Sequence, residues 1–143
     1  GYRVACWRAR DDAALAPRLA AAEIVVNLLP LTPATHGVLN AAAFAAMPRG
    51  ASVVNLARGA HVVDADLIAA LDHGHLHRAV LDVFGTEPLP REHAFWRHPK
   101  VTVLPHVAAL TDPRSAAAVV AANLDALARG APIEHLVDRA RGY

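Results

Sequence analysis

Three residues suited to the reduction of a keto acid each come just after a short apolar segment. They are Arg58, Glu87 and His106, which follow the apolar segments 53–57, 79–83 and 101–104. An arginine can hold a carboxylate through two parallel hydrogen bonds, a histidine can transfer a proton, and a glutamate can orient that histidine. The carboxyl ends of parallel strands meet at one edge of a sheet, where α/β folds bind ligands. We therefore expect the three side chains to meet in one site.

Each of the three residues also has an ordinary interpretation: a surface arginine, a solvated glutamate and a structural histidine. Their joint placement favours a functional trio over three unrelated side chains. A carboxylate next to a histidine raises the pKa of the imidazole, so a Glu87–His106 pair would favour an imidazolium able to protonate a developing alkoxide. Asp82 lies inside its apolar segment and needs a partner if it is buried. A cofactor amide and a backbone N–H are both candidates.

The alternation of apolar runs with helical patterns predicts an α/β fold with a parallel sheet. The runs are apolar on both faces, which is typical of a sheet covered by helices on both sides. Strands are expected over residues 2–7, 24–29, 52–57, 79–84 and 101–104. Helices are expected over 13–22 after an Asp11 or Asp12 cap, over 35–47, from Asp64 to Gly74, and from an Asp112 cap to about Arg129.

The composition excludes several classes of protein. A formal net charge of +1 offers no electrostatic reason to bind nucleic acid or a membrane. No apolar run reaches the roughly 18 residues of a membrane span. Cys6 is the only cysteine, so a reducing cytoplasmic compartment is expected, with Cys6 in the core of the first strand. Neither Ser52 nor Ser115 lies in the Gly-x-Ser-x-Gly turn of a serine hydrolase.

Two further segments could bind ligands. His73, His75 and His77 alternate and could bind zinc or nickel, but their place in a connection after a helix argues against a physiological metal site.

The segment Trp7–Arg10 carries two arginines and no acid before Asp11. In dinucleotide folds an acid near this place binds the ribose hydroxyls, whereas arginine accommodates a 2′-phosphate. The pattern favours NADP over NAD, although two solvated charges are the simpler interpretation.

Several motifs in order resemble the D-isomer-specific 2-hydroxyacid dehydrogenases. They are Asn55-Leu56-Ala57-Arg58-Gly59, Leu81-Asp82-Val83-Phe84 with Glu87-Pro88-Leu89-Pro90, and Pro105-His106-Val107-Ala108. The segments 28–33 and 137–143 are similar to those of the glyoxylate/hydroxypyruvate reductase A subgroup. The resemblance implies a Rossmann-like fold and NADPH-dependent reduction of a small 2-keto acid, such as glyoxylate or hydroxypyruvate, by a homodimer.

The resemblance also implies a role for each position. Arg58 would bind and polarise the keto acid, His106 would be the acid/base, and Glu87 would be its partner. The remaining positions would contact the cofactor: Asp82, Leu56 and Ala57 at the nicotinamide, Leu29 and Pro30 on the adenosine side, and Trp7, Arg8 and Arg10 near the 2′-phosphate.

The glycine-rich phosphate loop of this family, Gly-x-Gly-x-x-Gly, is missing from the 143 residues. We therefore expect the C-terminal part of a longer enzyme, inactive by itself and lacking the first βα unit. Residues 1–132 would be a partial cofactor domain, and residues 133–143 a tail that returns to an absent substrate domain. Loss of a central strand would separate strands 2–7 and 24–29 from the other three, so the sheet would rearrange or associate through its edges. The rival hypotheses are a non-catalytic packing module and a metal-binding module.

Overall fold

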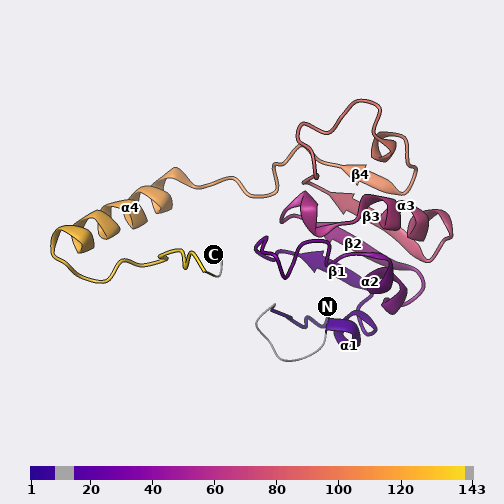
Figure 1. Ribbon diagram of the computed structural model, residues 1–143, viewed down its shortest axis with the longest axis horizontal. Helices are drawn as coiled ribbons and strands as arrows, with labels where there is room; N and C mark the ends of the chain where they lie inside the picture. The colour runs from indigo at the N-terminus through magenta and orange to yellow at the C-terminus, as the bar shows by residue number, and fades with distance from the viewer. Residues whose placement is uncertain (9–14, 141–143) are drawn as a thin grey trace.

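One parallel sheet forms the body of the protein (Figure 1). The computed structural model describes residues 1–8 and 15–140. The strands, in spatial order, are β1 (Ile24–Asn27), β2 (Ala51–Asn55), β3 (Leu76–Leu81) and β4 (Val101–Val103). The helices are α1 (Leu15–Leu19), α2 (Ala41–Ala46), α3 (Asp64–Asp72) and α4 (Pro113–Ala128), with 3-10 turns η1 (Gly59–His61) and η2 (Ala94–Trp96). The α/β class and the parallel sheet expected from the sequence are confirmed.

Local signals explain where the helices begin and end. The side chain of Asn40 accepts the backbone N–H groups of Ala42 and Ala43 at the start of α2, so this helix is shorter than the 35–47 expected. Asp112 caps α4 in the same way, with a proline in the first turn. Gly74 adopts a left-handed φ of 66° just after α3, as is common where a glycine ends a helix. The expected limits of α3 and α4 are confirmed.

The core lies on one face of the sheet. Val53, Ala79 and Leu81 are buried there against the side chains of α2 and α3. On the opposite face, Ile24 and Val26 are 46% and 51% exposed. Coverage of both faces was expected from the apolar runs, and that expectation is wrong for the described residues. Because the strands follow one another in order across the sheet, successive right-handed crossovers place their helices on the same face.

The expectation for residues 2–7 is also wrong. This segment forms no strand, and Tyr2, Val4 and Cys6 are exposed. A short apolar run becomes a strand only when its backbone pairs with a neighbour, and no described strand pairs with this one. The expected caps Asp11 and Asp12 lie outside the described residues.

The first two strands of the sheet are direct neighbours. β1 pairs with β2 over its whole length, from Ile24 opposite Ser52 to Asn27 opposite Asn55. The expected separation of residues 24–29 from the later strands is therefore wrong. Among the described strands, the unpaired edges of the sheet are the outer sides of β1 and β4, and no gap interrupts the four strands.

The helix α4 lies apart from the body (Figure 1), and none of its residues is buried. The chain then returns beside this helix, where the Asn123 side chain donates to the backbone carbonyl of Glu134 and accepts its N–H, at 3.1 and 3.0 Å. Within the described part of the chain, no helix is both long and apolar enough to cross a membrane.

Candidate active site at the carboxyl edge of the sheet

The three residues singled out by the sequence lie in the loops that leave β2, β3 and β4 at the same edge of the sheet. Arg58 precedes η1, Glu87 lies in the turn after β3, and His106 follows β4. The backbone hydrogen bonds between neighbouring strands continue past the strand ends. Asp82 N–H donates to the Asn55 carbonyl, and Leu104 N–H donates to the Leu81 carbonyl. The loops therefore start at a common level.

The Glu87 and His106 side chains are in direct contact. His106 Nδ1 lies 2.8 Å from Glu87 Oε2, and Glu87 Oε1 accepts the Phe84 N–H at 2.8 Å. These contacts lower the pKa of Glu87. The hydrogen bond with His106 has the largest effect, the bond from Phe84 N–H comes second, and the charge of Arg58 lowers the pKa least. An ionised carboxylate only accepts hydrogen bonds, so Nδ1 carries a proton and Nε2 is left for exchange with a ligand.

Asp82 holds the backbone that follows His106. Its two carboxylate oxygens accept the N–H groups of Val107 and Ala108 at 2.8 and 2.9 Å, and the residue is only 1% exposed. His106 itself has a left-handed φ of 56°, which is unfavourable for a residue with a side chain. The two bonds to Asp82 keep the chain in this conformation. Of the two partners left open by the sequence, the structure shows the backbone N–H; a contact with nicotinamide stays a prediction.

Arg58 forms one end of an open cleft. The cleft has a volume of about 520 Å³ and is lined by the loops after β1 and β2, residues 28–31 and 56–58. It contains four of the expected cofactor positions: Leu29, Pro30, Leu56 and Ala57. The exposed Arg58 side chain donates from Nη1 to the Ala57 carbonyl at 2.6 Å. The volume is within the range of small-molecule sites.

Gly59 brings the Arg58 loop against the Glu87 loop. A Cβ atom at Gly59 would overlap the backbone carbonyl of Phe84 and the nitrogen of Gly85. The close approach therefore depends on the missing side chain.

Sequence reasoning missed four buried polar residues behind the cleft. They are Asn27, Thr35, Asn55 and His61, all at most 4% exposed. Asn27 donates to Asn55 at 2.9 Å, and the side-chain oxygens of both accept backbone N–H groups two residues further on. The sequence contained one sign of the Asn27–Asn55 pair, because β1 and β2 each end in an asparagine that follows an apolar run.

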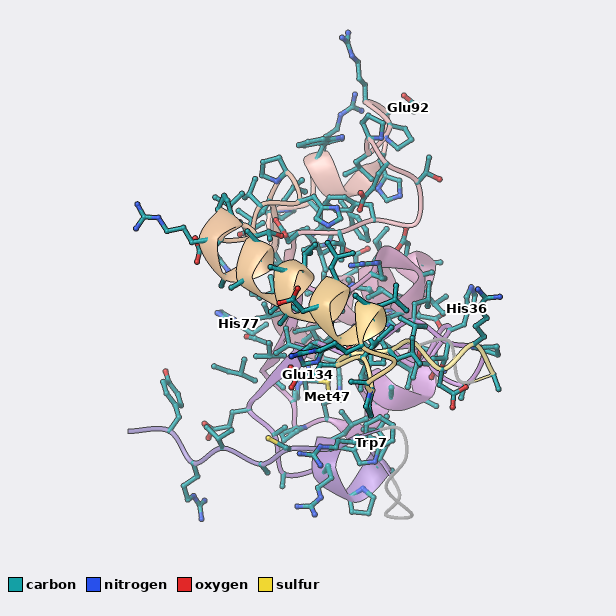
Figure 2. All side chains as sticks on the ribbon, turned by 90° about the vertical axis from the view of Figure 1, so that its left-hand side faces the viewer. Trp7, His36, Met47, His77, Glu92 and Glu134 are labelled. Carbon is teal, nitrogen blue, oxygen red and sulfur yellow. The ribbon has the colours of Figure 1, made fainter. Side chains whose placement is uncertain are left out.

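The proposed phosphate-binding segment is described only in part. Trp7 is half-buried and Arg8 is exposed, and Figure 2 shows Trp7 at the end of the molecule that carries α1. Arg10 lies outside the described residues. A role for these three residues at a 2′-phosphate stays a prediction.

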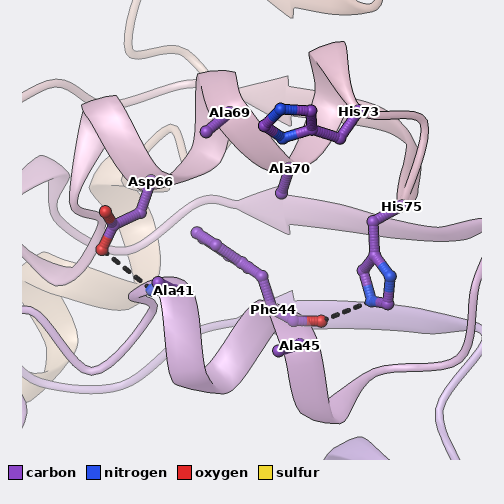
Figure 3. A pocket seen from close by; sticks show the side chains of 8 residues that line it. All are labelled: Ala41, Phe44, Ala45, Asp66, Ala69, Ala70, His73 and His75. Atoms are coloured by element: carbon purple, nitrogen blue, oxygen red, sulfur yellow. Dashed lines mark hydrogen bonds between the residues drawn. The ribbon is translucent and has the colours of Figure 1, made fainter.

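The histidine run lies at the opposite edge of the sheet. His75 Nε2 is 2.9 and 3.1 Å from the carbonyl oxygens of Phe44 and Met47, beside a groove between α2 and α3 (Figure 3). His73 and His77 are exposed. Across residues 1–8 and 15–140, no three His, Cys, Asp or Glu side chains are placed to hold a metal ion.

The chain resembles known proteins along most of its length. The family model described as D-isomer specific 2-hydroxyacid dehydrogenase, NAD binding domain, matches residues 8–108. The glyoxylate/hydroxypyruvate reductase A of Serratia proteamaculans is 46% identical over 154 aligned residues, which cover 100% of this chain and 49% of that protein. The chain thus spans about half the length of this curated relative.

Two solved structures share the fold. A D-isomer specific 2-hydroxyacid dehydrogenase from Xanthobacter autotrophicus Py2, in complex with NADPH and MES, has a TM-score of 0.87 and 47% identity, covering 90% of this chain and 53% of that chain. An NADPH-dependent glyoxylate/hydroxypyruvate reductase from Sinorhizobium meliloti, in complex with NADP and sulfate, has a TM-score of 0.87 and 43% identity, covering 93% and 44%.

Replacement of Gly59 by alanine should destabilise the protein, because its Cβ would displace the backbone at Phe84. We expect a loss of about 1–3 kcal/mol in the free energy of unfolding, measured by urea denaturation. Gly85→Ala is the matched control, since its Cβ would meet nothing within 4 Å. Equal free energies of unfolding for the two variants would contradict the close approach of the loops.

The Glu87 carboxyl should titrate below the ordinary value of 4.5, as followed by NMR of its side chain. Because folding lowers this pKa, the stabilisation is present above the ordinary value and is lost as the pH falls through the folded value. His106→Ala should move the midpoint up towards 4.5 but leave part of the shift, because the Phe84 N–H remains. His36→Ala, at an exposed position, should change nothing. A wild-type midpoint at or above the ordinary value would refute the pair.

Proposed function

The chain belongs to the D-isomer-specific 2-hydroxyacid dehydrogenases, and we propose that it contributes the acid/base pair and the substrate-binding arginine of an NADPH-dependent reductase for glyoxylate or hydroxypyruvate. The observation that carries this proposal is the contact of 2.8 Å between His106 and Glu87, together with the packing of the Glu87 loop against that of Arg58. The names of the Serratia and Sinorhizobium relatives support the choice of substrate. We further propose that the reductase is a cytoplasmic homodimer.

In the proposed reaction each of the three side chains would have its own role. Arg58 would hold the carboxylate of the 2-keto acid with its planar fork and draw electron density towards the keto oxygen. His106 would give the proton on Nε2 to that oxygen, so that the carbonyl group of the substrate would become a hydroxyl group. Glu87 would keep the imidazole in one orientation through its contact with Nδ1. The nicotinamide supplies the hydride when the cofactor is bound.

The residues of the cleft fit part of a dinucleotide. The segments 28–31 and 56–58 offer apolar side chains and backbone groups along the carboxyl edge, where this class of fold binds its cofactor. The glycine-rich loop that would supply N–H donors to the pyrophosphate is not among the 143 residues. We infer that this chain provides one side of the cofactor site. It should therefore bind NADPH weakly by itself.

A chimaera tests the proposed activity. Residues 1–143 would replace the matching part of the Serratia proteamaculans reductase, which aligns with the whole chain. The chimaera should reduce glyoxylate with NADPH, whereas the 143-residue chain alone should not. A folded chimaera that binds NADPH but is inactive would overturn the proposal and favour a non-catalytic packing module.

In this chimaera, Arg58→Ala should lower kcat/KM for glyoxylate by roughly ten- to hundredfold, as expected when a charge-assisted hydrogen bond is lost. Arg58→Lys should lose less, because lysine retains the charge without the fork. Arg49→Ala is the matched control, since this exposed arginine precedes β2 at the opposite edge. Steady-state kinetics in which Arg58→Ala equals the wild type would exclude the substrate role.

The preference for NADPH should depend on the arginines near residue 8. Joint replacement of Arg8 and Arg10 by alanine in the chimaera should raise the Kd for NADPH by at least roughly tenfold, the effect of one lost charged hydrogen bond. Binding of NADH, measured in the same titration calorimeter, should change little. Arg3→Ala is the control within the same exposed segment. Equal losses for both cofactors would argue against recognition of the 2′-phosphate.

A further inference from the structure

His61 is a buried histidine at the cleft with no role in the proposed chemistry. It is 0% exposed, and its ring is within hydrogen-bonding distance of both loops that line the cleft. Nδ1 is 3.1 Å from the carbonyl oxygen of Arg58, and Nε2 is 3.3 Å from that of Pro30. Carbonyl oxygens only accept hydrogen bonds, and a neutral imidazole carries one N–H, so the ring donates to one of the two carbonyl oxygens and contacts the other. The imidazole thus links the backbone of one loop to that of the other.

Neither carbonyl depends on His61 to be satisfied. The Arg58 carbonyl also accepts from Asn55 Nδ2 at 3.0 Å, and the Pro30 carbonyl accepts from Thr35 Oγ1 at 2.7 Å. Each loop is therefore tied to its own side of the cleft by a buried side chain. The Asn27–Asn55 bond joins the two sides at the strand ends, and His61 joins them further out, at Arg58 and Pro30.

We propose that His61 is a positioning residue for the reductase reaction: by bridging Arg58 and Pro30, it sets the distance between the substrate-binding arginine and the opposite wall of the cofactor cleft. The inference rests on the proposed function, since it acts through Arg58. The Arg58 side chain is exposed, so its placement depends on the backbone that carries it. Reaction rates are sensitive to such placement, because a displacement of about 1 Å can cost roughly a hundredfold.

His61→Phe keeps an aromatic ring in place and removes both ring nitrogens. The second donors at Arg58 and Pro30 remain, so the fold should be retained. His75→Phe is the matched control. His75 also bonds to backbone carbonyls of another segment, that of Phe44 (Figure 3) and that of Met47, but it lies at the opposite edge of the sheet. His61→Gln, which retains one donor, serves as a second variant should phenylalanine prevent folding.

In the chimaera, His61→Phe should lower kcat/KM for glyoxylate by roughly tenfold or more. The kcat/KM of His61→Gln should lie between that of His61→Phe and that of the wild type, and His75→Phe should keep the wild-type kcat/KM. The loss should shrink when Arg58 is already lysine, because two residues that act through one another are not additive. A residue that only stabilised the fold would give additive losses. Full activity of both His61 variants, or strict additivity with Arg58→Lys, would overturn the proposal.

Amide NMR spectra of the 143-residue chain separate this inference from the proposed function. His61→Phe should shift the amide resonances of Leu31 and Gly59 together, on both sides of the cleft, and His75→Phe should shift neither. Unchanged resonances would refute the bridge, whether or not the chimaera is active. An inactive wild-type chimaera with a normal bridge would instead refute the reductase activity, and with it the part of His61 in catalysis.

Discussion

Parallel hydrogen bonding between neighbouring strands is the constraint on which the candidate site depends. The register sets Asn55 opposite Leu81 and Leu81 opposite Val103, so β2, β3 and β4 end at one level. All three strands run in the same direction, and their following loops therefore leave the same edge. An antiparallel neighbour would send its loop to the other edge. Arg58, Glu87 and His106 are far apart along the chain, and this shared polarity brings their loops together.

Buried polar groups then hold those loops in place. Asn27, Asn55 and Asp82 are each at most 4% exposed, and all three accept backbone N–H groups from the segments that follow the strands. A buried acceptor left without a donor costs about 1–3 kcal/mol, so the loops cannot shift without losing these bonds. Asp82 has a particular effect, because it holds the chain beside His106 in a left-handed conformation that would otherwise be unfavourable.

The proposed site would combine parts that this chain contains with one that the 143 residues lack. The contact between Glu87 and His106 and the arginine beside them are complete within the 143 residues. The glycine-rich phosphate loop is not present in them. The two faces of the sheet also differ. One face is packed under α2 and α3, whereas Ile24 and Val26 are exposed on the other. The proposed acid/base chemistry therefore depends on contacts within the chain, whereas the proposed cofactor binding would also need phosphate-binding N–H donors that these 143 residues do not supply in a glycine-rich loop.

The sequence by itself determined the features that local patterns encode. Apolar runs located four strands, caps and a glycine located α3 and α4, and the motifs around Arg58, Glu87 and His106 identified the family. Only the tertiary structure decided which strands are neighbours: the run at 2–7 has a strand pattern without a partner, and 24–27 lies directly beside β2. It also revealed His61, which is an ordinary loop histidine in the sequence. Strand pairing and the burial of a polar side chain arise from contacts between distant residues, and no local pattern records them.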